Sequence, residues 1–255
     1  SLDRDIGNVC NRVIFERDLS RLELPDPRGP ERFAGFAERC AAGAGYFVEY
    51  SIGFSLFERA WTLRGMEDLF IDMLEAPSFV DELLDAICDY NVALVEQAVQ
   101  YDVDTVYFGD DWGSQRGLLM GRKSWERFLK PRLARQYAAA KRAGKFVTIH
   151  SCGKVQEVFP DLIEIGLDCF NPFQPEVMDP YEMKRRFGDR LSFWGGVSTQ
   201  RLLPYGTPNQ VREEVRRLMA EVGRDGGYIL APAHAIPGDA KPENVMAMIE
   251  TINAQ

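Results

Sequence analysis

Six short runs rich in β-branched and aromatic residues recur along the chain, and longer stretches with helical periodicity separate them. The runs lie at residues 46–52, 105–109, 146–150, 168–171, 191–195 and 228–231. Most are apolar at successive positions, as strands are when both faces of a parallel sheet are covered. We therefore expect six buried parallel strands.

The stretches between the runs predict amphipathic helices. Thr207 followed by Pro208 is a typical helix start, because an N-cap residue precedes a proline at the first helical position. Glycines at the ends of several stretches mark helix stops. The predicted helices cover residues 66–98 (two helices, divided near Pro77), 124–143 (with Ser124 as N-cap), 155–165, 179–187, 207–222 and 242–252.

Strands that alternate with helices of this length indicate an α/β fold with a parallel sheet. Polar residues follow almost every run, and this is typical of a (β/α)8 TIM-type barrel, which gathers functional groups at the carboxyl ends of its strands. Such a barrel needs eight strands, so we expect its N-terminal part to be absent from this chain. We expect a single domain over residues 1–255, with an irregular or helical lead-in at 1–45 and β/α units at 46–255.

The composition narrows the function classes. The chain has 255 residues and a net charge of −9. The negative charge argues against binding to nucleic acid or to an anionic membrane. No segment approaches the roughly 18 uninterrupted apolar residues of a membrane span, and the first residues lack the apolar stretch of a signal peptide. An odd number of cysteines, five, suits the reducing cytoplasm.

The two histidines of the chain both follow predicted strands. His150 and Cys152 leave the run 146–150 two positions apart, so both can face the same end of a barrel, and His234 lies just beyond the run 228–231. Three such protein ligands with an open fourth position are typical of catalytic zinc. The alternative is a metal-free site in which His234 is an acid or a hydrogen-bond donor.

Asp110 and Asp111 directly follow the run 105–109. A carboxylate pair can supply a metal ligand, a general base or an anchor for an NH-bearing ligand, and mutual repulsion raises one pKa. The alternative is a solvated loop or a helix cap for the following segment.

Four more residues are candidates for substrate binding: Glu49, Trp112, Gln174 and Trp194. Glu49 interrupts an apolar run, where an unpaired carboxylate is unfavourable. It is expected either to point into the barrel toward the site or to pair with an arginine outside it.

Several of these residues belong to blocks that carry a family resemblance. The blocks include Gly109-Asp110-Asp111-Trp112-Gly113, His150-Ser151-Cys152-Gly153, Gln174-Pro175-Glu176 and Phe193-Trp194-Gly195-Gly196-Val197. In this order, over about residues 30–255, the chain resembles the uroporphyrinogen decarboxylase superfamily. That superfamily includes the zinc-dependent methylcobalamin:thiol methyltransferases and related corrinoid methyltransferases. The resemblance implies a (β/α)8 barrel that lacks its N-terminal part.

Two chemistries diverge within that superfamily. In the methyltransferases, zinc ligands match His150 and Cys152, and a third ligand, usually cysteine, falls at His234. The decarboxylases lack the H-x-C pair, carry a histidine at the position of His234, and have tyrosine and serine where Trp61 and Asp110 stand. The chain therefore resembles the methyltransferase branch more closely while sharing one decarboxylase feature.

The resemblance implies zinc-assisted methyl transfer between a small methylated or thiol compound and a corrinoid (cobalamin) carried by a partner protein. Asp110 or Asp111 would orient the substrate or complete the zinc shell, and Gln174 would supply an amide contact. The alternatives are decarboxylation of a tetrapyrrole carboxylate, with His234 and Asp110 stabilising charge, and a barrel that only binds a corrinoid or tetrapyrrole. A cytoplasmic protein is expected, with a homodimer as one option.

Overall fold

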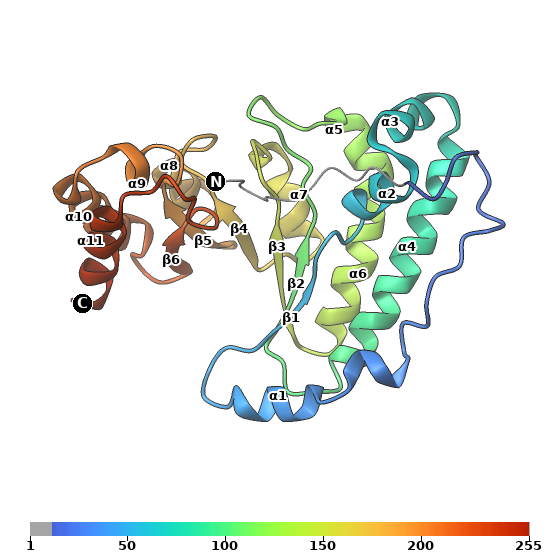
Figure 1. Cartoon of the computed structure of the whole chain (residues 1–255), viewed down its shortest axis with the longest axis horizontal. Coiled ribbons are helices and arrows are strands. Elements are labelled where there is room, and N and C mark those ends of the chain that lie inside the picture. The colour runs from blue at the N-terminus through green and yellow to red at the C-terminus, as the bar shows by residue number, and fades with distance from the viewer. Residues whose placement is uncertain (1–11, 255) are drawn as a thin grey trace.

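The computed structural model describes residues 12–254 and contains a parallel sheet of six strands (Figure 1). The strands pair in the order in which they occur along the chain. They confirm the six predicted runs, with differences of at most three residues at their ends. The strands are β1 (Glu49–Ile52), β2 (Thr105–Gly109), β3 (Phe146–His150), β4 (Cys169–Phe173), β5 (Ser192–Val197) and β6 (Tyr228–Pro232).

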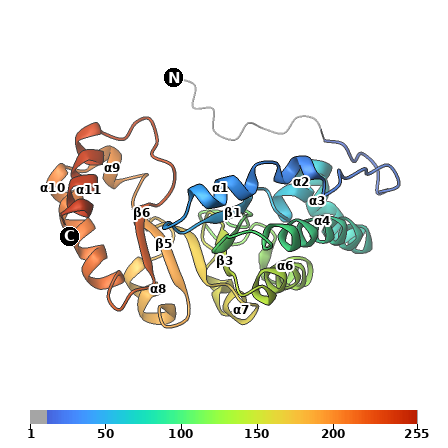
Figure 2. The same cartoon turned by 90° about the horizontal axis from the view of Figure 1, so that it is seen from below.

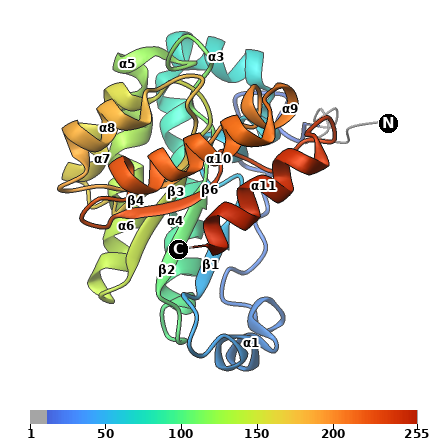
Figure 3. The same ribbon diagram turned by 90° about the vertical axis from the view of Figure 1, so that its left-hand side faces the viewer.

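Helices connect successive strands and lie along one side of the sheet (Figure 2). The last two long helices, α10 and α11, pack side by side (Figure 3). The helices are α1 (Phe36–Ala42), α2 (Phe57–Arg64), α3 (Met66–Glu75), α4 (Pro77–Ala98), α5 (Gly121–Ser124), α6 (Lys130–Arg142), α7 (Phe159–Glu164), α8 (Pro180–Phe187), α9 (Leu202–Tyr205), α10 (Pro208–Arg217) and α11 (Pro242–Asn253).

The predicted α/β class is confirmed, and the strand–helix repeat is that of part of a (β/α)8 barrel. Within the described residues the sheet is open, with β1 and β6 as its edges. Residues 12–45 hold a short 3-10 helix, Pro30–Phe33, and α1. Residues 1–11 of the predicted lead-in lie outside the described part. Over residues 12–254, no helix is both long and apolar enough to cross a membrane.

One helix start differs from the prediction. Ser124 is the last residue of α5, and its side chain caps no helix. A π-helical turn, Trp125–Leu129, joins α5 to α6. Pro131 lacks the N–H that an α-helix would direct to the carbonyl of Arg127, so a widened turn fits at this point. The predicted cap at Thr207, by contrast, forms a capping box with Gln210.

The apolar core lies between the sheet and the helices. Alternate strand residues such as Phe108 and Phe170 are fully buried on this side. The ring centroid of Phe108 lies 5.5 Å from that of Tyr137 in α6, and that of Phe170 lies 4.7 Å from that of Phe159 in α7. The intervening strand positions face the other side of the sheet and include the polar residues Thr105, Thr148, His150 and Asn171.

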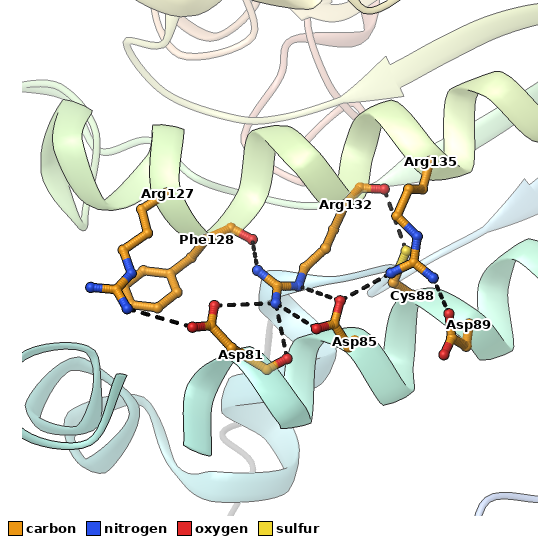
Figure 4. Close-up of polar contacts among 8 residues, drawn as sticks. All are labelled: Asp81, Asp85, Cys88, Asp89, Arg127, Phe128, Arg132 and Arg135. Atoms are coloured by element: carbon orange, nitrogen blue, oxygen red, sulfur yellow. Dashed lines mark hydrogen bonds and ion pairs between the residues drawn. The ribbon is translucent and has the colours of Figure 1, made fainter. Parts of the chain in front are cut away.

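Arginine–aspartate pairs tie α4 to α6 (Figure 4). The side chain of Arg132 is nearly buried, and its Nε and Nη2 atoms donate to the two carboxylate oxygens of Asp85 at 3.0 and 2.8 Å. Arg132 also donates to Asp81 at 3.1 Å and to the carbonyl oxygen of Phe128 at 3.0 Å. Arg127 is more exposed and reaches Asp81 only at 3.5 Å. Arg132 is therefore the central residue of this helix contact.

We expect Arg132→Ala to lower the free energy of unfolding by about 2 kcal/mol, because a nearly buried, multiply hydrogen-bonded guanidinium is lost while its partly exposed partners regain water. Arg127→Ala is the matched control and should cost about 0.5 kcal/mol or less, as exposed pairs do. Urea denaturation measures both values. Equal losses in the two variants would contradict the central role of Arg132.

Candidate metal centre

Three donor side chains meet at the carboxyl ends of the strands. His150 ends β3, Cys152 follows it closely, and His234 lies in the loop after β6. Their ligand atoms all lie within 4.8 Å of one another, and Nε2 of His150 is 3.4 Å from Sγ of Cys152. Ligand atoms around a tetrahedral zinc ion are roughly 3.3–3.6 Å apart. The His150–Cys152 pair therefore fits zinc, and the exposed His234 side chain supplies a third donor.

The loops after β2 and β3 approach each other backbone to backbone. A Cβ atom on Gly153 would lie 2.4 Å from the carbonyl carbon of Gly113. A Cβ atom on Gly113 would lie 2.4 Å from the carbonyl oxygen of Cys152. Both positions therefore require glycine, and the close approach brings the aspartates after β2 next to the donors after β3.

The orientation of His150 is set by Asn171 in β4. Nδ2 of Asn171 donates to the carbonyl oxygen of Trp194 at 3.1 Å, so its side-chain oxygen faces Nδ1 of His150 at 2.6 Å. This oxygen can only accept, so Nδ1 carries the proton and Nε2 keeps the lone pair that a metal needs. The hydroxyl of Tyr107 donates to the same oxygen at 3.1 Å. Burial lowers the pKa of His150 and thereby also favours its neutral form.

Asp111 lies beside the donors. Its Oδ1 accepts the backbone N–H of Cys152 at 2.7 Å and is 3.8 Å from Nε2 of His150. The side chain of Asp111 is about one-third exposed, so its carboxylate can also meet a ligand. This position suits the predicted role in orienting a substrate, and that role stays a prediction.

Asp110 has a different environment. It is fully buried, and its carboxylate accepts the backbone N–H groups of Leu56, Phe57 and Glu58 at 3.1, 3.1 and 2.9 Å and the indole N–H of Trp112. The three backbone groups start α2, so Asp110 satisfies the N–H groups that a helix leaves unpaired. Burial raises the pKa of Asp110 to about 6. Asp110 thus has the contacts of a helix cap and not those of a general base, but the helix that it caps, α2, precedes it in the chain and is not the following segment that the alternative named.

The four predicted substrate-binding residues lie in two environments. Trp112 is fully buried against Trp125, and the buried Gln174 accepts the backbone N–H of Gly153 at 2.8 Å, so both stabilise loops. Trp194 lies on the same side of the sheet as Tyr107, and their ring centroids are 5.9 Å apart. Glu49 is exposed and forms no ion pair within residues 12–254. An arginine partner for Glu49 is therefore not found in the described part.

Two residues that were not predicted as site residues contribute to this geometry: Tyr107 and Asn171. Asn171 had a signal in the sequence, since it is a polar residue at the end of a predicted strand. Tyr107 had none, because an aromatic residue in a strand is ordinary.

A cavity of about 970 Å³ lies apart from the donors. Residues 13–16 and 21–25, β1 and α4 line it, with Tyr50 and Asn91 among the contributing side chains. None of His150, Cys152 and His234 lines this cavity.

The profile of the family described as Uroporphyrinogen decarboxylase (URO-D) matches residues 54–255. The chain belongs to this family. The matched region contains β2 to β6 and all three candidate metal ligands, so the site described above lies within the part that the family shares.

Two relatives named uroporphyrinogen decarboxylase show how much sequences within the family differ from this chain. The Methylococcus capsulatus protein is 26% identical over 262 residues, which cover 95% of this chain and 70% of that protein. The Ruthia magnifica protein is 24% identical over 183 residues, which cover 71% of this chain and 51% of that protein. The chain thus spans between about half and 70% of the length of these relatives.

A solved structure, a methyltransferase from Methanosarcina mazei, is similar with a TM-score of 0.74 at 19% sequence identity. The likeness covers 94% of this chain and 70% of that one. At this identity it shows a shared fold.

We expect Asp110→Asn to lower the free energy of unfolding by about 1–3 kcal/mol, because the amide NH₂ would face N–H donors and leave buried groups unpaired. Asp111→Asn is the matched control, and its partly exposed amide should keep stability within about 0.5 kcal/mol of the wild type. Thermal or urea unfolding compares them. Full stability of Asp110→Asn would contradict the capping role.

Asn171→Leu should weaken zinc binding by roughly 10–100-fold, since Nδ1 of His150 loses the acceptor that holds its proton and its ring orientation. Tyr107→Phe removes only the second donor to the Asn171 oxygen and should change zinc affinity much less. Competition with a chromophoric chelator measures both affinities. If Asn171→Leu bound zinc as the wild type does, Asn171 would not be the residue that orients His150.

Proposed function

We propose that this chain is a zinc-dependent methyltransferase, which moves a methyl group between a small methylated or thiol compound and a corrinoid carried by a partner protein. The observation that supports this most is the meeting of His150, Cys152 and His234, whose donor atoms lie within 4.8 Å of one another. Two nitrogens and one sulfur suit zinc, and three protein ligands leave a fourth position for substrate.

The residues around the donors suit this chemistry. A zinc ion at this site would lower the pKa of a thiol or polarise a leaving oxygen or nitrogen. Asn171 keeps the proton of His150 on Nδ1, and Asp111 fixes the backbone of Cys152 while presenting a carboxylate next to the donors. In transfer to a thiol, the methylated corrinoid would be a co-substrate: the S–CH₃ bond would form as the bond from the methyl group to the corrinoid breaks, the bonding electron pair would remain with the corrinoid, and the thiol proton would leave to solvent.

Decarboxylation of a tetrapyrrole carboxylate is the second candidate, and the names of the relatives favour it. The grouped donors His150, Cys152 and His234 support the first candidate instead. A barrel that binds a corrinoid without catalysis is the third candidate, and turnover separates it from the first.

Protein purified without chelator is expected to carry stoichiometric zinc, measured by elemental analysis. Cys152→Ala and His234→Ala should lose most of it, because only two protein donors remain. His234→Cys is the matched variant and should retain zinc, since a thiolate is also a zinc ligand. A wild-type protein that neither carries nor takes up zinc would contradict the site.

Methyl transfer is tested with free methylcobalamin and a small thiol, followed by the absorbance change of the corrinoid. We expect turnover by the zinc-loaded wild type and its loss in Cys152→Ala. Porphyrinogen carboxylate is the competing substrate in a parallel assay. Its consumption by both proteins, without any methyl transfer, would assign the chain to the decarboxylase chemistry instead.

A further inference from the structure

The cavity beside β1 has no part in the metal centre, and it has the dimensions of a ligand site. Its volume of about 970 Å³ is that of a pocket for a small organic molecule. Residues of β1 line one part of it, and α4 lines another. The residues of α4 are three and four positions apart and therefore form one stripe along the helix: Ile87, Tyr90, Asn91 and Leu94.

The α4 stripe combines an apolar surface with one polar side chain that is held in place. Ile87 and Leu94 are buried. Asn91 is only 4% exposed, and its Nδ2 donates to the carbonyl oxygen of Ser55 and, at 3.2 Å, to Oε1 of Gln136. These bonds use Nδ2, so Oδ1 remains as an acceptor. A ligand that fits this wall therefore has a mainly apolar body.

Arginines on regular elements supply positive charge at the cavity. Arg32, in the 3-10 helix Pro30–Phe33, donates through Nε to the carbonyl oxygen of Asp26 at 2.9 Å. Its guanidinium carbon lies 5.3 Å from the ring centroid of Tyr90. Arg59 lines the cavity from α2, and neither arginine forms an ion pair within residues 12–254.

The carboxylates of the lining are placed differently. All of them belong to the irregular stretch 13–25, which also contributes Arg21: Glu16, Asp18 and Glu23. Asp18 already accepts the backbone N–H and the hydroxyl of Ser20, both at 2.8 Å. The charge that the helices present to the cavity is therefore positive.

Residues 18–25, here called the strap, form the side of the cavity through which a ligand can enter. Before the strap, Arg17 bonds to the buried Asp72 at 2.7 Å, and after it Arg28 reaches Glu96 at 3.1 Å. The hydrogen bonds of the strap itself are local, and none joins it to another part of residues 12–254. The strap can therefore move aside without breaking a tertiary hydrogen bond.

We propose that this cavity is a binding site for a small molecule with an apolar body and one anionic group, separate from the metal centre. The body lies along the α4 stripe, and the anionic group meets Arg32, whose guanidinium is held beside Tyr90. Charge-assisted hydrogen bonds to a guanidinium are among the strong polar contacts of proteins. The three metal donors do not line the cavity, so this inference does not depend on the proposed function.

Two fluorescent probes of similar shape test the two parts of the proposed ligand. Anilinonaphthalene sulfonate has an apolar body with a sulfonate, whereas phenylnaphthylamine has the same rings without a charge. Both are titrated into the folded protein, and circular dichroism checks that each variant is folded. We expect saturable binding of the sulfonate probe at one site per chain. Cys152→Ala should bind it as the wild type does, because Cys152 does not line the cavity.

Arg32→Gln should weaken the sulfonate probe roughly 10-fold and the uncharged probe less than about twofold, because it removes a charge-assisted hydrogen bond but little apolar surface. Arg39→Gln is the matched control and should match the wild type. Arg39 also donates to a backbone carbonyl, that of Ala34, and lies over the ring of Phe36, but it does not line the cavity.

Leu94→Phe narrows the cavity and should weaken the binding of both probes. Ile87→Phe replaces it if that variant does not fold. Unchanged affinity for both probes in the narrowed variant would place them outside the cavity and overturn the proposal.

Three further results would overturn it: no saturable binding, wild-type affinity for the sulfonate probe in Arg32→Gln, or an equal loss in Arg39→Gln. Equal weakening of both probes in Arg32→Gln would overturn the assignment of an anionic ligand. A wild-type chain that binds no zinc would contradict the proposed function and would leave these expectations unchanged.

Discussion

The buried carboxylate of Asp110 connects the segments on which the candidate metal centre depends. It accepts N–H groups from the start of α2 and from the indole of Trp112, while its own backbone N–H donates to the carbonyl oxygen of His150 at 2.9 Å. The first turn of a helix offers unpaired N–H groups and a positive dipole end, so an aspartate is favoured there. Asp110 thereby links α2, the loop after β2 and the end of β3.

The polar residues around Asp110 have different roles according to whether they are buried or exposed. Asp110 and Gln174 are buried and hold backbone segments, whereas Asp111 and His234 have exposed surface and can meet a ligand. Asn171 stands between the two groups, because it is buried and yet decides which nitrogen of His150 is available. The donors, of which His234 is exposed and His150 and Cys152 are half-buried, are thus supported by hydrogen-bonded residues behind them, as metal ligands generally are.

Membership in the uroporphyrinogen decarboxylase family shows the ancestry of this fold, and the site carries the argument for its chemistry. The relatives named above are decarboxylases, while a methyltransferase has a similar structure. A barrel keeps its strands and helices while the residues at the carboxyl ends of the strands change, so both chemistries are compatible with one architecture. The donor set of this chain is the observation on which the proposal of methyl transfer rests.

The sequence alone was enough for the six strands, the α/β class and the gathering of His150, Cys152 and His234. Strand and helix periodicities are local properties, and parallel strands bring their carboxyl ends to the same edge of a sheet. The sequence could not assign different roles to Asp110 and Asp111, because they are adjacent residues of the same type. Only the tertiary structure decided that one is buried under α2 and the other faces the donors, because successive residues of an extended loop point in different directions. The role of Asn171 likewise depends on contacts between segments far apart in the chain, and no local pattern encodes such contacts.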